Sequence, residues 1–102
     1  MGTEIGVKLD QGKPRMSLVL GGFAEALTAV AAVGTFGAQK YTDNGWREVP
    51  QGQERYTDAL LRHLLAPEDI DPESGHYHDA HVAWNALARL NLRITNNDTE
   101  ND

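Results

Sequence analysis

The fold of this chain is decided by the stretch HYHDAHVAWNALARLNLRI, residues His76–Ile94. Apolar side chains recur in it at three- and four-residue intervals, which is the spacing of one face of an α-helix. A polar row follows the same spacing on the opposite face. A helix that is apolar on most sides and has one narrow polar row is typical of the centre of a small bundle. The apolar row is Ala83, Ala86, Leu87, Leu90 and Ile94, and the polar row is His78, His81, Asn85 and Arg89.

Two further segments show helical periodicity. Ser17–Lys40 has apolar or small residues at helical spacing along its length, and Gln53–Ala66 is stopped by Pro67. The run TDNGWREVPQG between them, Thr42–Gly52, is rich in turn residues. No segment of useful length alternates like a strand. The sequence therefore predicts an all-α fold, a small bundle of about three main helices.

A chain of 102 residues predicts a single domain. We expect a flexible N-terminal segment over residues 1–15, one helical domain over 16–95, and a disordered acidic tail over 96–102. A domain this short buries only roughly two thirds of the surface of its unfolded chain. We therefore expect a homo-oligomer, in which other copies complete the bundle.

Composition excludes several classes of protein. The net charge of −6 disfavours a nucleic acid polymer as partner, although a local pocket can still bind a small anion. The absence of cysteine excludes disulfides and thiolate metal sites. No apolar run is long enough to span a membrane, and residues 1–15 lack the apolar run of a secretory signal. These features predict a cytoplasmic protein without a membrane partner.

The polar row of the last helix is the most informative candidate site. Residues three and four apart meet on one helix face, which brings His78, His81 and Asn85 together. Two imidazoles and an amide can ligate a divalent metal or hydrogen-bond a base and phosphates. The alternative is a solvated face or histidines satisfied within the core. The row lacks the Lys and Glu of an ordinary solvent face, which favours a site.

Acidic residues suggest where a metal would bind. The loop PEDIDPESG, Pro67–Gly75, gathers carboxylates that suit Mg²⁺ or Mn²⁺, with helix capping and solvation as the alternative. On the preceding helix, Asp58 and Arg62 have the spacing of an ordinary ion pair, and His63 lies off that face. The predicted metal ligands are Asp58, Asp69, Asp71 and Glu73.

Basic and aromatic side chains gather after the first helix. Such a cluster can hold phosphates and stack a base. The alternative is that the aromatic rings fill the edge of the core while the basic groups are solvated. No P-loop and no nucleophile elbow is present, so hydrolysis would use a metal-activated water. The cluster consists of Lys40, Tyr41, Asn44, Trp46 and Arg47.

Four blocks in this order resemble a known family. They are GKPRMSL, TFGAQKYTDNGWR, RYTDALLRHLLA and EDIDPESGHYHDAHVAWNAL, and together they cover about Lys13 to Leu90. They look like the N-terminal domain of phage dATP/dGTP diphosphohydrolases. The resemblance implies a helical, MazG-like relative of the pyrophosphohydrolases, which cleave a nucleoside triphosphate to monophosphate and pyrophosphate, and a location in the cytoplasm of the host cell.

This sequence departs from the metal-binding pattern of those enzymes. The pyrophosphohydrolases hold Mg²⁺ with carboxylates from two neighbouring helices, in a Glu-x-x-Glu and then a Glu-x-x-Asp pattern. Neither half is present here. The second helix offers Glu54 and Asp58, and the third offers histidines and Asn85.

The resulting prediction is a nucleotide-binding protein that hydrolyses purine deoxynucleoside triphosphates with the help of Mg²⁺ or Mn²⁺. Two alternatives remain. One is a non-catalytic protein that sequesters cyclic nucleotide signals of anti-phage defence, and the other is a structural or partner-binding helical protein. The predicted catalytic residues are Asp58, His63, His78 and His81. The predicted nucleotide-binding residues are Lys40, Tyr41, Asn44, Trp46, Arg47, Arg62 and Asn85.

Overall fold

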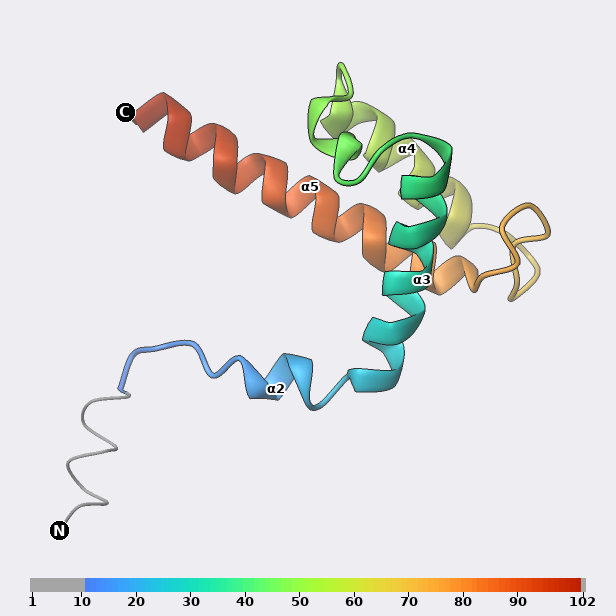
Figure 1. Cartoon of the computed structure of the whole chain (residues 1–102), viewed down its shortest axis with the longest axis horizontal. Helices are drawn as coiled ribbons and strands as arrows, with labels where there is room; N and C mark the ends of the chain where they lie inside the picture. Colours follow the sequence, from blue (N-terminus) through green and yellow to red (C-terminus); the bar gives the residue numbers. More distant parts are fainter. Residues whose placement is uncertain (1–10, 102) are drawn as a thin grey trace, which may run out of the picture.

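The computed structural model describes residues 11–101, with the side chains of residues 11–96, and is helical (Figure 1). No strand occurs in this part of the chain, so the predicted all-α fold is confirmed. Three long helices form the bundle. None of the helices in this range is long and apolar enough to cross a membrane. The elements are α2 (Ser17–Leu20), α3 (Ala24–Lys40), the 3-10 helix η1 (Gly45–Glu48), α4 (Gly52–Leu64) and α5 (His78–Asn101).

The first predicted helix, Ser17–Lys40, is broken in two. The chain leaves α2 through two glycines, and Phe23 then adopts the non-helical angles φ −120° and ψ 33°. A Cβ at Gly22 would lie 2.7 Å from the carbonyl oxygen of Leu18, an approach that only glycine permits. As a result α2 turns away from the axis of α3 (Figure 1). Sequence periodicity missed this break because apolar residues continue through it.

The core lies where α3 crosses α5. Val30 and Val33 of α3 pack there against Ala80 of α5, and these are the buried residues at the centre of the core. Small side chains at this crossing let the two helices approach closely. Beside it, a Cβ at Gly34 would lie 3.3 Å from Nε1 of Trp84, so α3 also passes close to the aromatic ring.

The helix ends differ from the prediction in understandable ways. Helix α4 starts at Gly52, after Gln51 adopts a left-handed conformation with φ 57°. Gly52 is buried, and a Cβ there would lie 3.1 Å from Leu92, so glycine sets the spacing between α4 and α5. Helix α5 continues to Asn101 over the segment expected to be a disordered tail. Residues 1–10 of the expected flexible segment lie outside the described residues.

Candidate metal and nucleotide site

The loop between α4 and α5 folds back on itself and holds one carboxylate against the start of α5. The backbone N–H of Asp71 donates to the carbonyl of His76 at 2.8 Å, and that of His78 donates to the carbonyl of Asp69 at 2.9 Å. Gly75 closes the turn with φ +78°, a conformation that favours glycine. The bends in the loop are therefore fixed by backbone hydrogen bonds within it.

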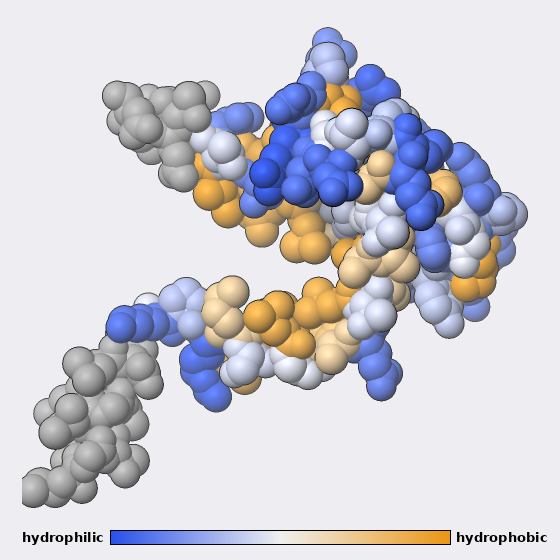
Figure 2. Space-filling view, in the orientation of Figure 1, coloured by the Kyte–Doolittle hydropathy of each residue, from blue (hydrophilic) through white to orange (hydrophobic). Residues whose placement is uncertain are grey.

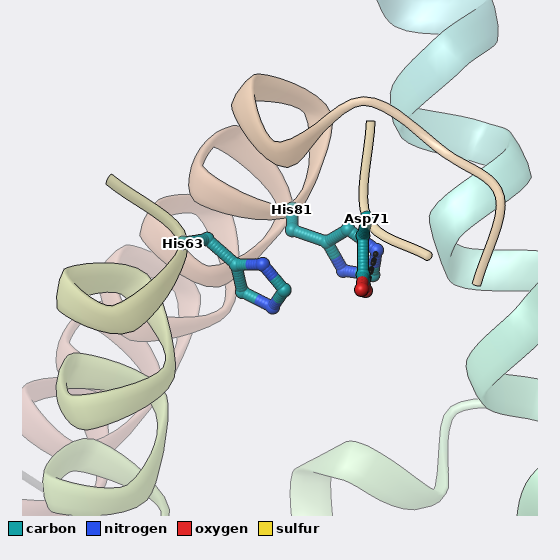
Figure 3. Close-up of side chains that lie close together, drawn as sticks. All are labelled: His63, Asp71 and His81. Carbon is teal, nitrogen blue, oxygen red and sulfur yellow. Dashed lines mark ion pairs between the residues drawn. The ribbon is translucent and has the colours of Figure 1, made fainter. Parts of the chain in front are cut away.

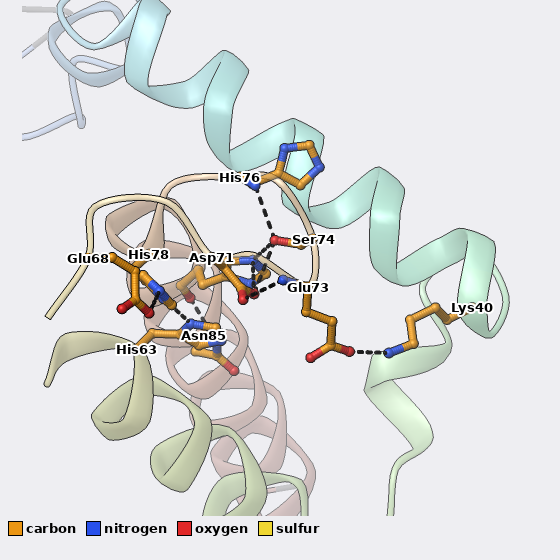
Figure 4. Close-up of polar contacts among 10 residues, drawn as sticks. Lys40, His63, Glu68, Asp71, Glu73, Ser74, His76, His78 and Asn85 are labelled. Atoms are coloured by element: carbon orange, nitrogen blue, oxygen red, sulfur yellow. Dashed lines mark hydrogen bonds and ion pairs between the residues drawn. The ribbon is translucent and has the colours of Figure 1, made fainter. Parts of the chain in front are cut away.

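The Asp71 carboxylate is oriented by its neighbours in the loop (Figure 4). Its Oδ1 accepts from the backbone N–H of Glu73 at 3.0 Å, and its Oδ2 accepts from the hydroxyl of Ser74 at 3.2 Å. Burial alone would raise the pKa of Asp71, but these hydrogen bonds and the nearby imidazoles of His63 and His81 hold that pKa below its usual value. Asp71 is therefore a negatively charged group at neutral pH.

Two imidazoles meet this carboxylate (Figure 3). His63 comes from α4 and His81 from α5, and one ligand atom from each of His63, Asp71 and His81 lies within 4.8 Å of the others. The two rings stack with centroids 4.1 Å apart and planes 6° from parallel. We call these three residues the His63–Asp71–His81 group.

The imidazoles of this group favour the neutral form. Burial lowers the pKa of both His63 and His81. Neighbouring imidazoles, including that of His78, lower both values further, and Asp71 opposes the shift. Neutral imidazoles keep the nitrogen lone pair that a metal or a proton donor needs.

A hydrogen-bonded chain reaches His63 from outside the group. Oε1 of Glu68 lies 3.1 Å from Nε2 of His78, and Nδ1 of His78 lies 2.8 Å from Nδ1 of His63. A carboxylate only accepts, so Nε2 of His78 donates to it. The two Nδ1 atoms share one hydrogen, which either ring can donate. When His63 is the donor, its lone pair is on Nε2.

The donors of the group determine which ions they suit. Two imidazoles and one carboxylate suit a transition-metal ion such as Mn²⁺, whereas Mg²⁺ prefers oxygen ligands. Each nitrogen lone pair lies in the plane of its ring, and stacked planes do not meet. A shared ion therefore requires one of the two imidazoles to rotate about its side-chain torsions.

Acidification is expected to destabilise the fold through this site. The pKa values of His63 and His81 lie below the ordinary 6.5 in the folded chain, so between these values the unfolded chain binds protons that the folded chain does not. The contribution of these two neutral imidazoles to the stability of the fold is complete above pH 6.5. It is lost as the pH falls through the pKa values that His63 and His81 have in the folded chain. The melting temperature in EDTA should fall by several degrees from about pH 7.5 to about pH 5.

The double variant His63→Gln, His81→Gln is the comparison for this experiment. Glutamine does not titrate, so the melting temperature of this variant should change less over the same interval. Asp79→Asn, which alters an exposed carboxylate at the start of α5, should keep the dependence of the unaltered chain. An equally steep dependence in the double variant would contradict the assignment to these imidazoles.

The structure brings together only some of the residues predicted from sequence. Side-chain contacts link His78, His63, His81 and Asp71. The buried Asn85 follows one turn along α5, where its Nδ2 donates to the carbonyl of His81 at 2.8 Å.

The predicted carboxylate ligands other than Asp71 are not part of the group. Asp58, a predicted ligand, is exposed on α4 and lies outside this group, and Arg62 is exposed on the same helix. The side chain of Asp69 is also exposed. Glu73 instead pairs with Nζ of Lys40 at 3.4 Å (Figure 4). Sequence spacing did not distinguish Asp71 from the acids around it.

The predicted basic and aromatic cluster is divided. Trp46 is partly buried, and its ring meets that of Trp84 edge to face with centroids 5.9 Å apart. Trp46 therefore follows the alternative in which its ring fills the edge of the core. Tyr41 is 75% exposed, and the guanidinium of Arg47 lies 5.5 Å from the Trp46 ring centroid. Asn44 forms a turn with φ 58°.

Two residues of the site, Glu68 and Ser74, were not among the predicted site residues. Glu68 contacts His78, and the hydroxyl of Ser74 lies 2.7 Å from Nε2 of His81. A serine three residues after an aspartate is a common turn pattern, and here the hydroxyl of Ser74 donates to the Asp71 carboxylate. That pattern was the available signal for Ser74.

Comparison with known proteins assigns the sequence to a family. The family model described as "dATP/dGTP diphosphohydrolase, N-terminal" matches residues 3–102. The chain belongs to this family. The resemblance found in the four sequence blocks is thereby confirmed, and the His63–Asp71–His81 group lies within the matched region.

A protein of Salmonella phage PMBT28, named dATP/dGTP diphosphohydrolase, is 38% identical to this family domain over 99 residues. The alignment covers 91% of the chain and 32% of the phage protein, so this domain spans about a third of the length of that relative. No solved structure matches the chain.

Proposed function

We propose that this domain hydrolyses purine deoxynucleoside triphosphates, dATP and dGTP, to the monophosphate and pyrophosphate, with a bound divalent metal ion. The observation that carries the proposal is the convergence of His63, Asp71 and His81 from three separate segments on one point. The printed name of the phage relative supports the class of substrate.

We propose Mn²⁺ as the ion, because two imidazoles and a carboxylate fit it better than they fit Mg²⁺. When bound, the ion supplies positive charge against phosphate oxygens and acidifies a water molecule. His63, Asp71 and His81 hold it. The proposal thus keeps one of the four carboxylates expected from sequence and replaces the others with imidazoles.

The surrounding residues position this group. Glu68 and His78 form a chain of contacts that orients the His63 ring. Such outer partners usually orient a metal-binding imidazole. Ser74 holds both the Asp71 carboxylate and the His81 ring. Lys40, whose ammonium pairs with Glu73 of the loop, is proposed to meet phosphate oxygens.

The test is incubation of the purified chain with dATP, dGTP, dCTP and dTTP, with Mn²⁺, with Mg²⁺ and with EDTA. Chromatography would then separate triphosphates, monophosphates and pyrophosphate. We expect monophosphate and pyrophosphate in equal amounts, from the purine nucleotides, with Mn²⁺ and not with EDTA. Release of inorganic phosphate in place of pyrophosphate would overturn the proposed reaction.

A second function, sequestration of a nucleotide without turnover, is favoured by one observation. The group contains a single carboxylate, so it carries less charge to hold an ion than a four-carboxylate site does. The same incubation, extended to cyclic di- and trinucleotides, separates the two functions. A ligand that disappears from solution and returns unaltered after heat denaturation would establish sequestration.

A further inference from the structure

Apolar side chains crowd the surface of the α2 end of the molecule (Figure 2). Each is more than half exposed, and α2 buries no residue. We call this set the apolar arm. It consists of Met16, Leu18, Val19, Leu20 and Phe23.

A second apolar surface lies on the distal half of α5. Leu87, Leu90 and Ile94 are each more than half exposed there. Together with Trp46 and Trp84 they line a shallow groove of about 310 Å³, which we call the α5 groove. Figure 2 shows apolar side chains on both walls of the open notch between the arm and this part of α5.

The arm is held away from the groove of its own chain. Helix α3 contacts α5 through Val30 and Val33 in the middle of α3, whereas α2 lies before Ala24, the first residue of α3. At a rise of about 1.5 Å per residue, the intervening helix separates the arm from the contact by roughly 10–15 Å. The arm can reach its own groove only if the packed crossing of α3 on α5 is broken or α2 swings about the glycine break.

The exposed area is large enough for a stable interface. Eight large apolar side chains of the arm and groove are more than half exposed. At roughly 100 Å² each, they offer on the order of 800 Å² per copy, which is the share that one partner contributes to a standard interface. Monomeric proteins seldom leave a contiguous apolar patch larger than a few hundred Å² in water.

We propose that two copies of this chain form a symmetric dimer, in which the apolar arm of each copy lies in the α5 groove of the other. The arm projects, the groove is recessed, and one chain has both. A two-fold axis therefore forms the contact twice and leaves no arm or groove free. This inference does not depend on the proposed nucleotide chemistry.

The sequence has no cysteine, so introduced cysteines can report the contact without interference. Two arm variants, Leu20→Cys and Phe23→Cys, are each mixed with Leu90→Cys under oxidising conditions. We expect a disulfide-linked dimer of one arm variant with the groove variant. Leu65→Cys, at a position 79% exposed at the end of α4, is the matched control and should not cross-link to Leu90→Cys above background.

Light scattering coupled to size exclusion measures the assembly itself. The unaltered chain should have twice the 11.2 kDa mass of one copy. Phe23→Glu and Leu90→Glu should both be monomeric, and Leu65→Glu should remain dimeric. All three positions are exposed, so circular dichroism should show unchanged helix content.

Two results would overturn the proposal. One is a monomer at every concentration tested, which would leave the surfaces to another protein or to a further domain. The other is an internal disulfide in the double variant Leu20→Cys, Leu90→Cys, which would mean that the arm folds onto its own groove. If the chain is dimeric but does not hydrolyse nucleotides, only the proposed function is refuted.

Discussion

Replacement of either imidazole of the His63–Asp71–His81 group, by His63→Gln or His81→Gln, is expected to abolish the proposed Mn²⁺-dependent cleavage of dATP and dGTP. Each variant removes one of the three metal ligands proposed among the described residues. Loss of an outer partner of a metal ligand typically weakens binding 10–100-fold. Loss of a ligand itself should therefore weaken Mn²⁺ binding by about 100-fold or more, measured by isothermal titration calorimetry.

Residues outside the His63–Asp71–His81 group should show smaller effects. Glu68→Gln keeps the shape of the side chain but weakens its hold on His78, so the affinity for Mn²⁺ should fall by about 10-fold, with the fold intact. Asp79→Asn, one residue from His78 and exposed, should change neither binding nor turnover by more than about twofold. Unchanged Mn²⁺ affinity in His63→Gln and His81→Gln would refute a metal site in this group.

The helices could be predicted from the sequence because their periodicity is local. The polar row that brings His78, His81 and Asn85 together follows from helix geometry alone, and the structure has that row at the buried side of α5. The break before α3 was not predictable in the same way. Gly21 and Gly22 weaken a helix without ending it, and the apolar pattern continues on both sides.

The choice of ligands could not be read from the sequence. Four acids in the loop are equivalent by composition, and only the folded turn, closed by Gly75 and held through Ser74, directs Asp71 towards the imidazoles. The sequence analysis placed His63 and Asp58 on different faces of α4, and the structure agrees. The partnership of His63 with His81 depends on how α4 packs on α5, which is not a local property.

Trp84→Ala is expected to cause the largest loss of stability among single changes. The Trp84 ring meets the rings of Trp46 and Tyr56 edge to face at 5.9 and 5.6 Å, and α3 passes close to it at Gly34. Removal of such a ring typically costs about 3–5 kcal/mol, a large share of the roughly 5–15 kcal/mol that stabilises a domain. Urea denaturation followed by circular dichroism measures the loss.

Trp84→Phe and Leu65→Ala are the comparison variants for the loss of stability in Trp84→Ala. Phenylalanine keeps an aromatic ring beside Tyr56, so the destabilisation should be less than half that of alanine. Leu65 is 79% exposed, and its replacement should change stability by less than about 0.5 kcal/mol. Because the same ring helps to hold α4 against α5, Trp84→Ala should also weaken Mn²⁺ binding, although Trp84 is not a ligand. A loss below about 1 kcal/mol would mean that the aromatic cluster does not hold the helices together.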